Sequence, residues 1–289
     1  MGCSVKLGRG RVAVALLGLL ASACSPLKIF NAVMPKDGGV RLAVRDAAFG
    51  ADPRQRLDVY APNAPSATLR PIIIFFYGGS WNSGTKSGYS FVGRALASRG
   101  FVVAIPDYRL VPQVRYPAFL EDNAAAVRWV RGHATEFGGD ADRLVLAGHS
   151  AGAYNAAMLA LDPRFLGADR KAVRGLIGIA GPYDFLPFDG PVVQQTFGAV
   201  SDAASTQPIT YVRAGAPPAF LATGDKDETV RPANSDSLAR RLEAAGTRVE
   251  RYRYPQVGHA GLVTAIARPL RGRASVLDDA TAFATQVTR

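Results

Sequence analysis

Cysteine is nearly absent from this sequence, which contains only Cys3 and Cys24. Cys3 falls inside an N-terminal leader, so the mature chain keeps at most one thiol and cannot form an intramolecular disulfide. Histidine is also scarce, with three residues in the chain, and the His and Asp residues show no spacing typical of metal ligands. We therefore expect no disulfide, no metal and no cofactor.

A long apolar run is also missing. The most pronounced one, VAVALLGLLASA at 12–23, is shorter than the roughly 18 residues that a membrane-spanning helix needs. Because basic residues precede it and Ala-Ser-Ala ends it, we predict a signal peptide over 1–23. Cys24 then resembles the lipidated cysteine of a bacterial lipobox, although the usual Leu stands at Leu20, one place too far back. The alternative is ordinary cleavage before an incidental Cys24. Either way we expect an exported protein of a bacterial cell envelope, lipid-anchored or else periplasmic.

Nucleic-acid motifs, internal repeats and low-complexity tracts are absent as well. The net charge of +11 falls to +8 once the three basic leader residues Lys6, Arg9 and Arg11 are removed. The remaining arginines are spread along the chain, which is typical of a solvated basic surface. We therefore expect no nucleic-acid partner, membrane contact only through the N-terminal lipid, and one globular domain over 40–289.

Short apolar runs alternate with helix-like stretches, which predicts an α/β fold with a mostly parallel central sheet flanked by helices. The near-continuous apolarity of IIIFF and LVLA is what strands covered on both faces require. The predicted strands are 56–60, 71–77, 101–108, 143–148, 175–181, 219–224 and 249–254. The predicted helices lie near 87–99, 119–137, 151–161, 235–245 and 276–287.

One strand-to-helix corner reads Gly148-His149-Ser150-Ala151-Gly152. The G-x-S-x-G pattern places a serine in a strained turn that exposes its hydroxyl at the sheet edge. The glycines are expected because side chains at Gly148 and Gly152 would collide with the neighbouring strand and helix. Ser150 is therefore the candidate nucleophile, at a helix start where unpaired N–H groups face developing negative charge.

A serine hydroxyl needs a base to remove its proton. His133 lies late in a predicted helix, and His149 is expected to pack beside the nucleophile. His259, on the loop after the last predicted strand, is the candidate base. A carboxylate must orient that imidazole, and the residues leave three open candidates, which are Asp225, Asp227 and the more distant Asp184.

These motifs together resemble the α/β-hydrolases. YGGSW at 77–81, DYRL at 107–110, GHSAG around Ser150, GDKDETV after the 219–224 strand and the final GH carry the likeness over about 57–259. The sequence is most similar to small esterases grouped with bacterial feruloyl- and carboxylesterase-like (BD-FAE-like) enzymes and to kynurenine formamidases.

The resemblance implies roles for individual residues. The family aspartate stands within G-x-x-D-x-x-V, which Gly224, Asp227 and Val230 match, so Asp227 is the implied acid. The backbone N–H groups of Gly79, Ser80 and Ala151 are the implied oxyanion hole. This sequence departs from the family at Tyr77, where the usual residue is a histidine that braces the loop.

The substrate pocket is predicted from Trp81, Tyr77 and Phe185, with a small cap insertion at about 182–218 that also contains Phe188 and Phe197. For Trp81, burial as an anchor for its loop is an equal alternative, and the phenylalanines are expected either to cover an apolar group or to pack the insertion down. Such a small cap favours short-chain or small aromatic esters as substrates. Two other functions stay open, an amidase or arylformamidase of the kynurenine formamidase type, and a catalytically dead surface binding module.

Overall fold

The computed structural model describes residues 26–289, so the predicted signal peptide and Cys24 lie outside the described residues. Its centre is an eight-stranded sheet with the order β1-β2-β4-β3-β5-β6-β7-β8. Strands β3 to β8 are mutually parallel, and β2 runs antiparallel to both of its neighbours. The strands are β1 Val40–Ala48, β2 Arg56–Pro62, β3 Arg70–Phe76, β4 Val102–Pro106, β5 Gly139–His149, β6 Val173–Ile179, β7 Ala219–Gly224 and β8 Val249–Tyr254.

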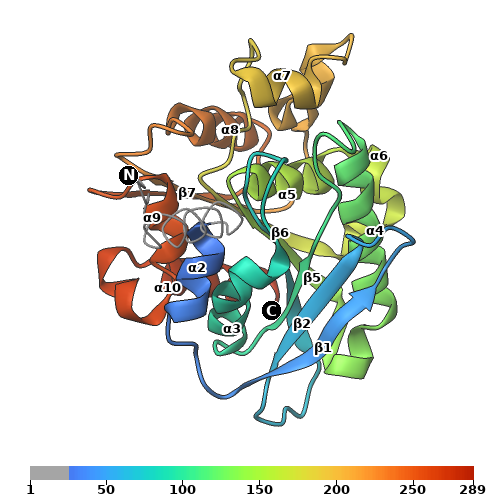
Figure 1. Cartoon of the computed structure of the whole chain (residues 1–289), viewed down its shortest axis with the longest axis vertical. Coiled ribbons are helices and arrows are strands. Elements are labelled where there is room, and N and C mark those ends of the chain that lie inside the picture. Colours follow the sequence, from blue (N-terminus) through green and yellow to red (C-terminus); the bar gives the residue numbers. More distant parts are fainter. Residues whose placement is uncertain (1–25) are drawn as a thin grey trace, which may run out of the picture.

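Helices cover both faces of the sheet (Figure 1). The α-helices are α2 Pro26–Val33, α3 Ser90–Ala97, α4 Ala118–Gly132, α5 Ala151–Leu161, α6 Pro163–Leu166, α7 Pro191–Phe197, α8 Ala233–Ala244, α9 His259–Thr264 and α10 Val276–Val287. Short 3₁₀ turns are η1 Lys86–Tyr89, η2 Ala134–Phe137, η3 Gly167–Ala172, η4 Ala203–Thr206, η5 Pro208–Tyr211 and η6 Arg268–Arg273. Helices α3 and α10 contact each other and the sheet on one face, whereas α4 and α5 contact each other and the sheet on the other. This is the α/β-hydrolase arrangement that the sequence predicts.

The central strands form the core. All side chains from Ile72 to Phe76 and from Leu144 to Ala147 are at most 1% exposed. Apolar groups that lose this much contact with water stabilise the fold by about 25 cal/mol per Å². The near-continuous apolar runs in the sequence therefore mark strands covered on both faces, as expected for a parallel sheet.

The predicted elements are confirmed with small shifts at their ends, and several short elements were not predicted. Strand β1 lies at the sheet edge, where most of its side chains are partly or fully exposed and its pairing register shifts twice. Its residues therefore lack the regular alternation of a half-buried strand. Helix α2 precedes residue 40, the predicted start of the domain, yet Leu27 and Phe30 from it pack against the core. The domain therefore extends at least to residue 26.

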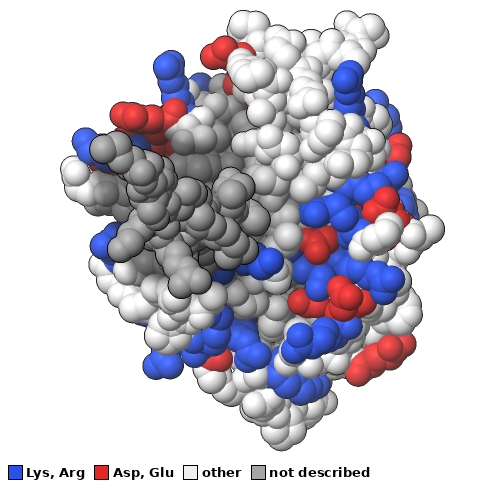
Figure 2. Space-filling model, viewed as in Figure 1, with Lys and Arg blue, Asp and Glu red and all other residues white. Residues whose placement is uncertain are grey.

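The cap segment, residues 182–218, joins β6 to β7 and contains α7, η4 and η5. Figure 1 shows α7 and its flanking loops projecting at the end of the molecule where α8 also lies. In the same view, Lys and Arg are interspersed with Asp and Glu beside α4, and most of the cap surface carries no charge (Figure 2). No helix within 26–289 is long and apolar enough to cross a membrane.

Candidate active site

Ser150 forms the corner between β5 and α5. Its backbone adopts φ 55° and ψ −125°, a strained conformation for a residue with a side chain. The turn tolerates no side chain at either glycine, because a Cβ on Gly148 would lie 2.2 Å from the Gly152 carbonyl oxygen. A Cβ on Gly152 would lie 2.0 Å from the Phe76 carbonyl oxygen on β3. The collisions predicted from the sequence are therefore confirmed.

Three side chains from separate elements meet at this corner. His259, the first residue of α9, has its Nε2 atom 2.9 Å from Ser150 Oγ. The other ring nitrogen, Nδ1, lies 2.8 Å from Asp227 Oδ2, on the loop that follows β7. Because the carboxylate can only accept, Nδ1 carries the proton and Nε2 is free to accept from the serine hydroxyl. The structure thus brings together the three residues that the sequence analysis paired by motif.

The Asp227 carboxylate is fully buried and held from two sides. Its Oδ1 accepts hydrogen bonds from the backbone N–H groups of Thr229 and Val230, at 3.0 and 2.8 Å. Burial alone would raise the pKa of this carboxyl. The hydrogen bonds from His259 and the two N–H groups outweigh burial and lower the pKa below its usual value. The two rival acids, Asp225 and Asp184, are exposed, and neither bonds to His259.

The other two histidines do not occupy the position of a base. His133 ends α4 and stacks on Trp129 with ring centroids 4.1 Å apart. His149 is 3% exposed, and its ring centroid lies 4.9 Å from that of His259. Burial, together with the nearby His259, lowers the pKa of His149 to about 3, so its ring is neutral at neutral pH.

The glycine loop, residues 78–84, lies beside Ser150. Three consecutive residues, Gly79, Ser80 and Trp81, have positive φ values of 134°, 50° and 59°. Successive unpaired N–H groups in a turn form a concave surface that favours anions. No described residue accepts a hydrogen bond from the N–H of Gly79 or Ser80. Ala151 is the first residue of α5, so its N–H also lacks a partner within the helix.

Tyr77 lies beneath the glycine loop and has no exposed surface. It does not line the substrate pocket, so that part of the prediction is wrong; the side chain points into the core instead. Its hydroxyl accepts a hydrogen bond from Arg54 Nη2 at 2.9 Å, and the same nitrogen donates to the Gly84 carbonyl at 3.0 Å. The ring stacks on Tyr108 with centroids 4.7 Å apart. Burial raises the pKa of the phenol well above its usual value, so it stays neutral. The phenol thus braces the loop through Arg54.

Trp81 fulfils both roles considered from the sequence. Its indole Nε1 donates to the Asn155 Oδ1 atom on α5 at 3.1 Å, and the side chain is 4% exposed. Its ring meets Phe197 of the cap segment edge-on, with centroids 4.9 Å apart. The remaining face of the side chain lines the pocket next to Ser150. The tryptophan therefore anchors the glycine loop and the cap segment to each other.

Two pockets adjoin Ser150. The larger, with a volume of about 520 Å³, is lined mainly by the cap segment and the loop after β7. Phe185 lines it, as predicted, together with Trp81, Leu186, Val192, Val193, Val230, Arg231, Glu228 and Asp189. The smaller, about 310 Å³, is lined by the glycine loop, Leu27, Tyr89, His149, His259 and Ala260. Of the two predicted aromatic partners, Phe197 is fully buried and Phe188 packs behind Phe185.

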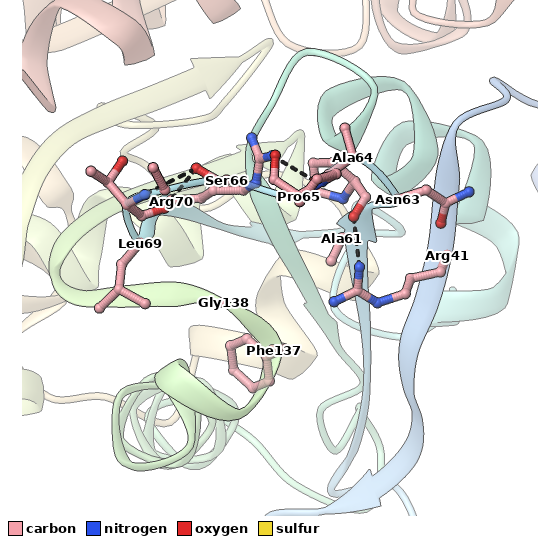
Figure 3. A pocket seen from close by; sticks show the side chains of 13 residues that line it. Arg41, Ala61, Asn63, Ala64, Pro65, Ser66, Leu69, Arg70, Phe137 and Gly138 are labelled. Atoms are coloured by element: carbon pink, nitrogen blue, oxygen red, sulfur yellow. Dashed lines mark hydrogen bonds between the residues drawn. The ribbon is translucent and has the colours of Figure 1, made fainter.

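A further pocket of about 280 Å³ lies elsewhere, lined by residues 61–70, Arg41, Phe137 and Gly138. The two arginines that Figure 3 shows there donate to backbone carbonyls, Arg41 to Pro62 at 2.7 Å and Arg70 to Ala64 at 2.9 Å. Arg70 begins β3, and the glycine loop follows the end of that strand. This pocket therefore lies at the amino ends of the parallel strands, opposite the end where Ser150 lies. Its lining includes the hydroxyls of Ser66 and Thr68 but no His, Asp or Glu that could act as a base.

Comparison with known families decides the relationship. The BD-FAE family model matches residues 57–242, which is more than half of the chain. The chain belongs to the BD-FAE family. This match contains Ser150 and Asp227 and ends before His259, so the position of the imidazole in this BD-FAE protein comes from the hydrogen bonds described above.

Two curated relatives and one solved structure are also similar to this chain. Esterase LipC of Mycobacterium tuberculosis is 31% identical over 239 residues, covering 74% of this chain and 59% of LipC. The isoprenylcysteine alpha-carbonyl methylesterase ICME of Arabidopsis thaliana is 27% identical, covering 81% of this chain and 60% of its own. The chain thus spans about six-tenths of the length of these relatives. An esterase B from Lactobacillus rhamnosis superposes with a TM-score of 0.80 at 19% identity, over 98% of this chain and 97% of its own. That likeness shows the shared fold.

Sequence reasoning missed the residues that hydrogen-bond to Tyr77, His149 and Trp81 around this BD-FAE site. Arg54, Tyr89 and Asn155 carry no motif, and their partners lie 23, 60 and 74 residues away along the chain. Only the folded sheet brings such pairs together. For Asn155 a weak signal existed, since a buried asparagine in an Ala-rich helix needs a hydrogen-bond partner.

Proposed function

We propose that this protein is a serine carboxylic ester hydrolase in which Ser150, His259 and Asp227 form the catalytic triad. The observation that carries the proposal is the unbroken hydrogen-bond chain from Ser150 Oγ through His259 to the buried Asp227 carboxylate. Esterase names among the relatives, LipC and ICME, support the same reaction class.

The reaction begins when His259 Nε2 takes the Ser150 proton and Oγ attacks the ester carbonyl. The carbonyl oxygen becomes an oxyanion, which the N–H groups of Gly79, Ser80 and Ala151 stabilise. The imidazolium then gives the proton to the leaving alcohol as the carbon–oxygen bond breaks, and an acyl-enzyme remains. Water, deprotonated by His259, attacks the acyl carbon. The imidazolium then returns the proton to Ser150 Oγ as the acyl–Oγ bond breaks, which releases the acid and free Ser150. Asp227 keeps the Nδ1–H tautomer and stabilises the imidazolium throughout.

We assign each half of the ester, the alcohol and the acyl group, to one of the two pockets. His259 must reach the leaving oxygen to protonate it, and His259 lines only the smaller pocket. The alcohol therefore occupies that side, and the acyl group occupies the larger pocket under the cap segment. Phe185, Val192 and Val193 give the acyl pocket apolar walls. We propose short-chain or small aromatic acyl groups as its substrates.

The acyl pocket is proposed to have a fixed size because the cap segment is pinned to the body. Tyr154 of α5 donates to the Thr206 carbonyl of the segment at 2.8 Å, and within the segment Gln207 accepts from the Phe185 N–H at 2.8 Å. The Trp81–Phe197 contact joins the same segment to the glycine loop. The far end of a long acyl chain would therefore extend beyond the pocket into solvent.

Labelling with a fluorophosphonate probe tests the triad. The wild-type chain should be labelled at Ser150, Ser150→Ala should not be, and Ser83→Ala, a serine of the glycine loop that donates to the Gly79 carbonyl, should still be labelled. Absence of labelling in the wild-type chain would establish a catalytically dead binding module instead.

Turnover on C2 to C12 nitrophenyl esters and on N-formylkynurenine ranks the substrates. We expect the short esters to be hydrolysed fastest. Faster cleavage of the formamide than of every ester would favour an arylformamidase, which employs the same triad with an amine as leaving group.

Cellular location is proposed from the leader alone. We propose that residues 1–23 are removed and that Cys24 carries lipid at the bacterial envelope. Intact-mass analysis of membrane-extracted protein should show a lipidated Cys24 terminus. An unmodified Cys24 in the soluble periplasm would overturn the lipid anchor and leave export in place.

A further inference from the structure

His149 stands one residue before the nucleophile and takes no part in the proposed proton transfers, yet both of its ring nitrogens have partners. Nδ1 lies 3.3 Å from the Tyr89 hydroxyl, and Nε2 lies 3.3 Å from the His259 carbonyl oxygen. The Tyr89 hydroxyl in turn lies 3.2 Å from the backbone nitrogen of Gly78 in the glycine loop. These contacts form a continuous path from the glycine loop to the backbone of His259.

The direction of each hydrogen bond follows from its fixed ends. The Gly78 N–H can only donate, so the Tyr89 oxygen accepts there and directs its single proton to His149 Nδ1. His149 therefore carries its own proton on Nε2. At the other end the His259 carbonyl can only accept, and Nε2–H is the donor that it requires. One neutral tautomer of His149 satisfies all of these contacts, whereas the other tautomer leaves Nε2 without a proton against the His259 carbonyl oxygen.

The surroundings hold the imidazole in this state. His149 is 3% exposed and Tyr89 is 2% exposed, so water has little access to these hydrogen bonds although both residues border the smaller pocket. The glycine loop lies directly on the ring, because a Cβ on Gly78 would stand 3.0 Å from His149 Nδ1 and 2.9 Å from the His149 carbonyl oxygen.

We infer that His149 is a positioning residue that fixes the glycine loop relative to the catalytic base through Tyr89. The oxyanion donors and the imidazole come from separate parts of the chain, after β3 and after β8. The distance between these donors and the imidazole must stay fixed. Only then can Ser150 attack in the same geometry in which the donors bind the oxyanion. The Gly78–Tyr89–His149–His259 path is a direct polar connection between the two. This inference rests on the proposed function.

Kinetics of Tyr89→Phe, His149→Phe and the double variant test the connection. Each single variant should lower kcat per active site about tenfold, the effect expected for the loss of one orienting hydrogen bond, with KM within about twofold. The double variant should be no slower than the worse single variant, because the path is already broken. Active sites are counted by fluorophosphonate titration, so a smaller folded fraction does not mimic the effect. Tyr60→Phe, which changes a buried tyrosine of β2 outside the site, should retain wild-type kcat.

Two outcomes would overturn the inference. If the fold-losses of kcat in the two single variants multiply in the double variant, Tyr89 and His149 act independently. If the kcat values equal that of Tyr60→Phe, the two side chains contribute only packing. If His149→Phe does not fold, His149→Met takes its place, since methionine fills irregular space without a ring nitrogen.

A second measurement does not depend on activity. Nitrogen-15 NMR of the histidine rings in the wild-type chain should show His149 protonated on Nε2 and bare on Nδ1 at neutral pH. The opposite tautomer would overturn the inference even in an active enzyme. A wild-type chain that fails to react with fluorophosphonate would instead refute the proposed function, while the NMR tautomer would still report on the hydrogen bonds.

Discussion

Asp227 orients the His259 ring from a position with no contact with solvent. Replacing it with Asn keeps the size of the side chain and both hydrogen bonds from the loop N–H groups to Oδ1. The amide group, however, can present its NH₂ toward Nδ1 and so favour the imidazole tautomer that cannot accept the serine proton. The consequence is a loss of catalysis that exceeds the loss of stability.

Asp227→Asn should therefore lower kcat by roughly 10³- to 10⁴-fold. Asp225→Asn, two residues earlier on the same loop and exposed, is the matched control and should change kcat less than about threefold. Steady-state kinetics on a short nitrophenyl ester, with thermal unfolding measured alongside, separates activity from folding. Similar losses in both variants would contradict the assignment of Asp227.

Tyr77 supports the glycine loop through Arg54, so its hydroxyl should matter although it is far from the reacting atoms. Tyr77→Phe removes one hydrogen bond from the part-buried Arg54 guanidinium, whose Nη2 keeps its hydrogen bond to the Gly84 carbonyl, and should cost about 1 kcal/mol of unfolding free energy, together with a several-fold lower kcat. Tyr254→Phe also removes one tyrosine hydrogen bond, to Asp279 at 2.7 Å, but outside the loop. It should lose stability and keep kcat. Urea unfolding and kinetics on both variants make the comparison, and unchanged kcat in Tyr77→Phe would refute the bracing role.

Sequence reasoning reached the residues of the site whose positions depend on local turns. Ser150 is fixed by its strand–turn–helix context, and His259 and Asp227 each follow a predicted strand. The role of His149 was underestimated because its partners, Tyr89 and the His259 carbonyl, lie 60 and 110 residues away. Hydrogen bonds across such separations depend on strand order, which a single sequence does not contain. Tyr77 was misassigned to the pocket because nothing local indicates on which side of the loop the ring lies.

At the scale of elements, strands with a continuous apolar run or a regular alternation were predicted, and a strand with neither was not. The strands β7 and β8 and the helices α5 and α10 match their predicted bounds. Strand β7 is a continuous apolar run, and β8, although it is an edge strand, alternates Arg and Tyr over 251–254. Strand β1 escaped prediction because its exposed and buried side chains do not alternate regularly and its pairing register shifts twice. The short helices α7 and α9 have seven and six residues, too few for a periodic pattern.

In the proposed function the acyl group lies in the larger pocket, where Phe185 of the cap segment forms an aromatic wall beside Trp81, with ring centroids 6.4 Å apart. Phe185→Ala should enlarge the pocket and raise the ratio of kcat/KM on a C8 ester to that on a C4 ester by about tenfold. Phe188→Ala removes the same group from the same segment behind the pocket, where it packs on Phe197, and should leave the ratio unchanged. Equal ratios in the two variants would show that the acyl group binds elsewhere.

At the scale of the whole molecule, the sheet gathers the proposed catalytic groups at one edge. The turns after β3, β5, β7 and β8 all lie at the carboxyl ends of parallel strands, where ligand sites of such sheets form. His149 is buried and neutral at this end of the strands, so the free energy of unfolding depends on pH. His149 has its pKa lowered to about 3 by burial and by the neighbouring His259, against an ordinary value of 6.5.

Below pH 6.5 the unfolded chain therefore binds a proton at His149 that the folded chain does not bind until about pH 3. The unfolded state then holds more protons, so stability falls as the pH drops through this window, by at most about 1.4 kcal/mol per pH unit from this group. His259, Asp227 and the Tyr89 hydroxyl face the ring or lie close to it, and all three remain when His149 is replaced. The lowered pKa of Asp227 adds its own loss of stability at more acidic pH in both proteins.

Urea unfolding of the wild-type chain and His149→Phe at pH 7, 6, 5 and 4.5 should show the difference. The wild-type free energy of unfolding should decline more steeply between pH 6 and 4.5, and the variant should be flatter by up to about 1.4 kcal/mol per pH unit. Parallel curves for the wild-type chain and His149→Phe would mean that His149 binds its proton equally well in both states, which is incompatible with a ring held neutral between Tyr89 and the His259 carbonyl.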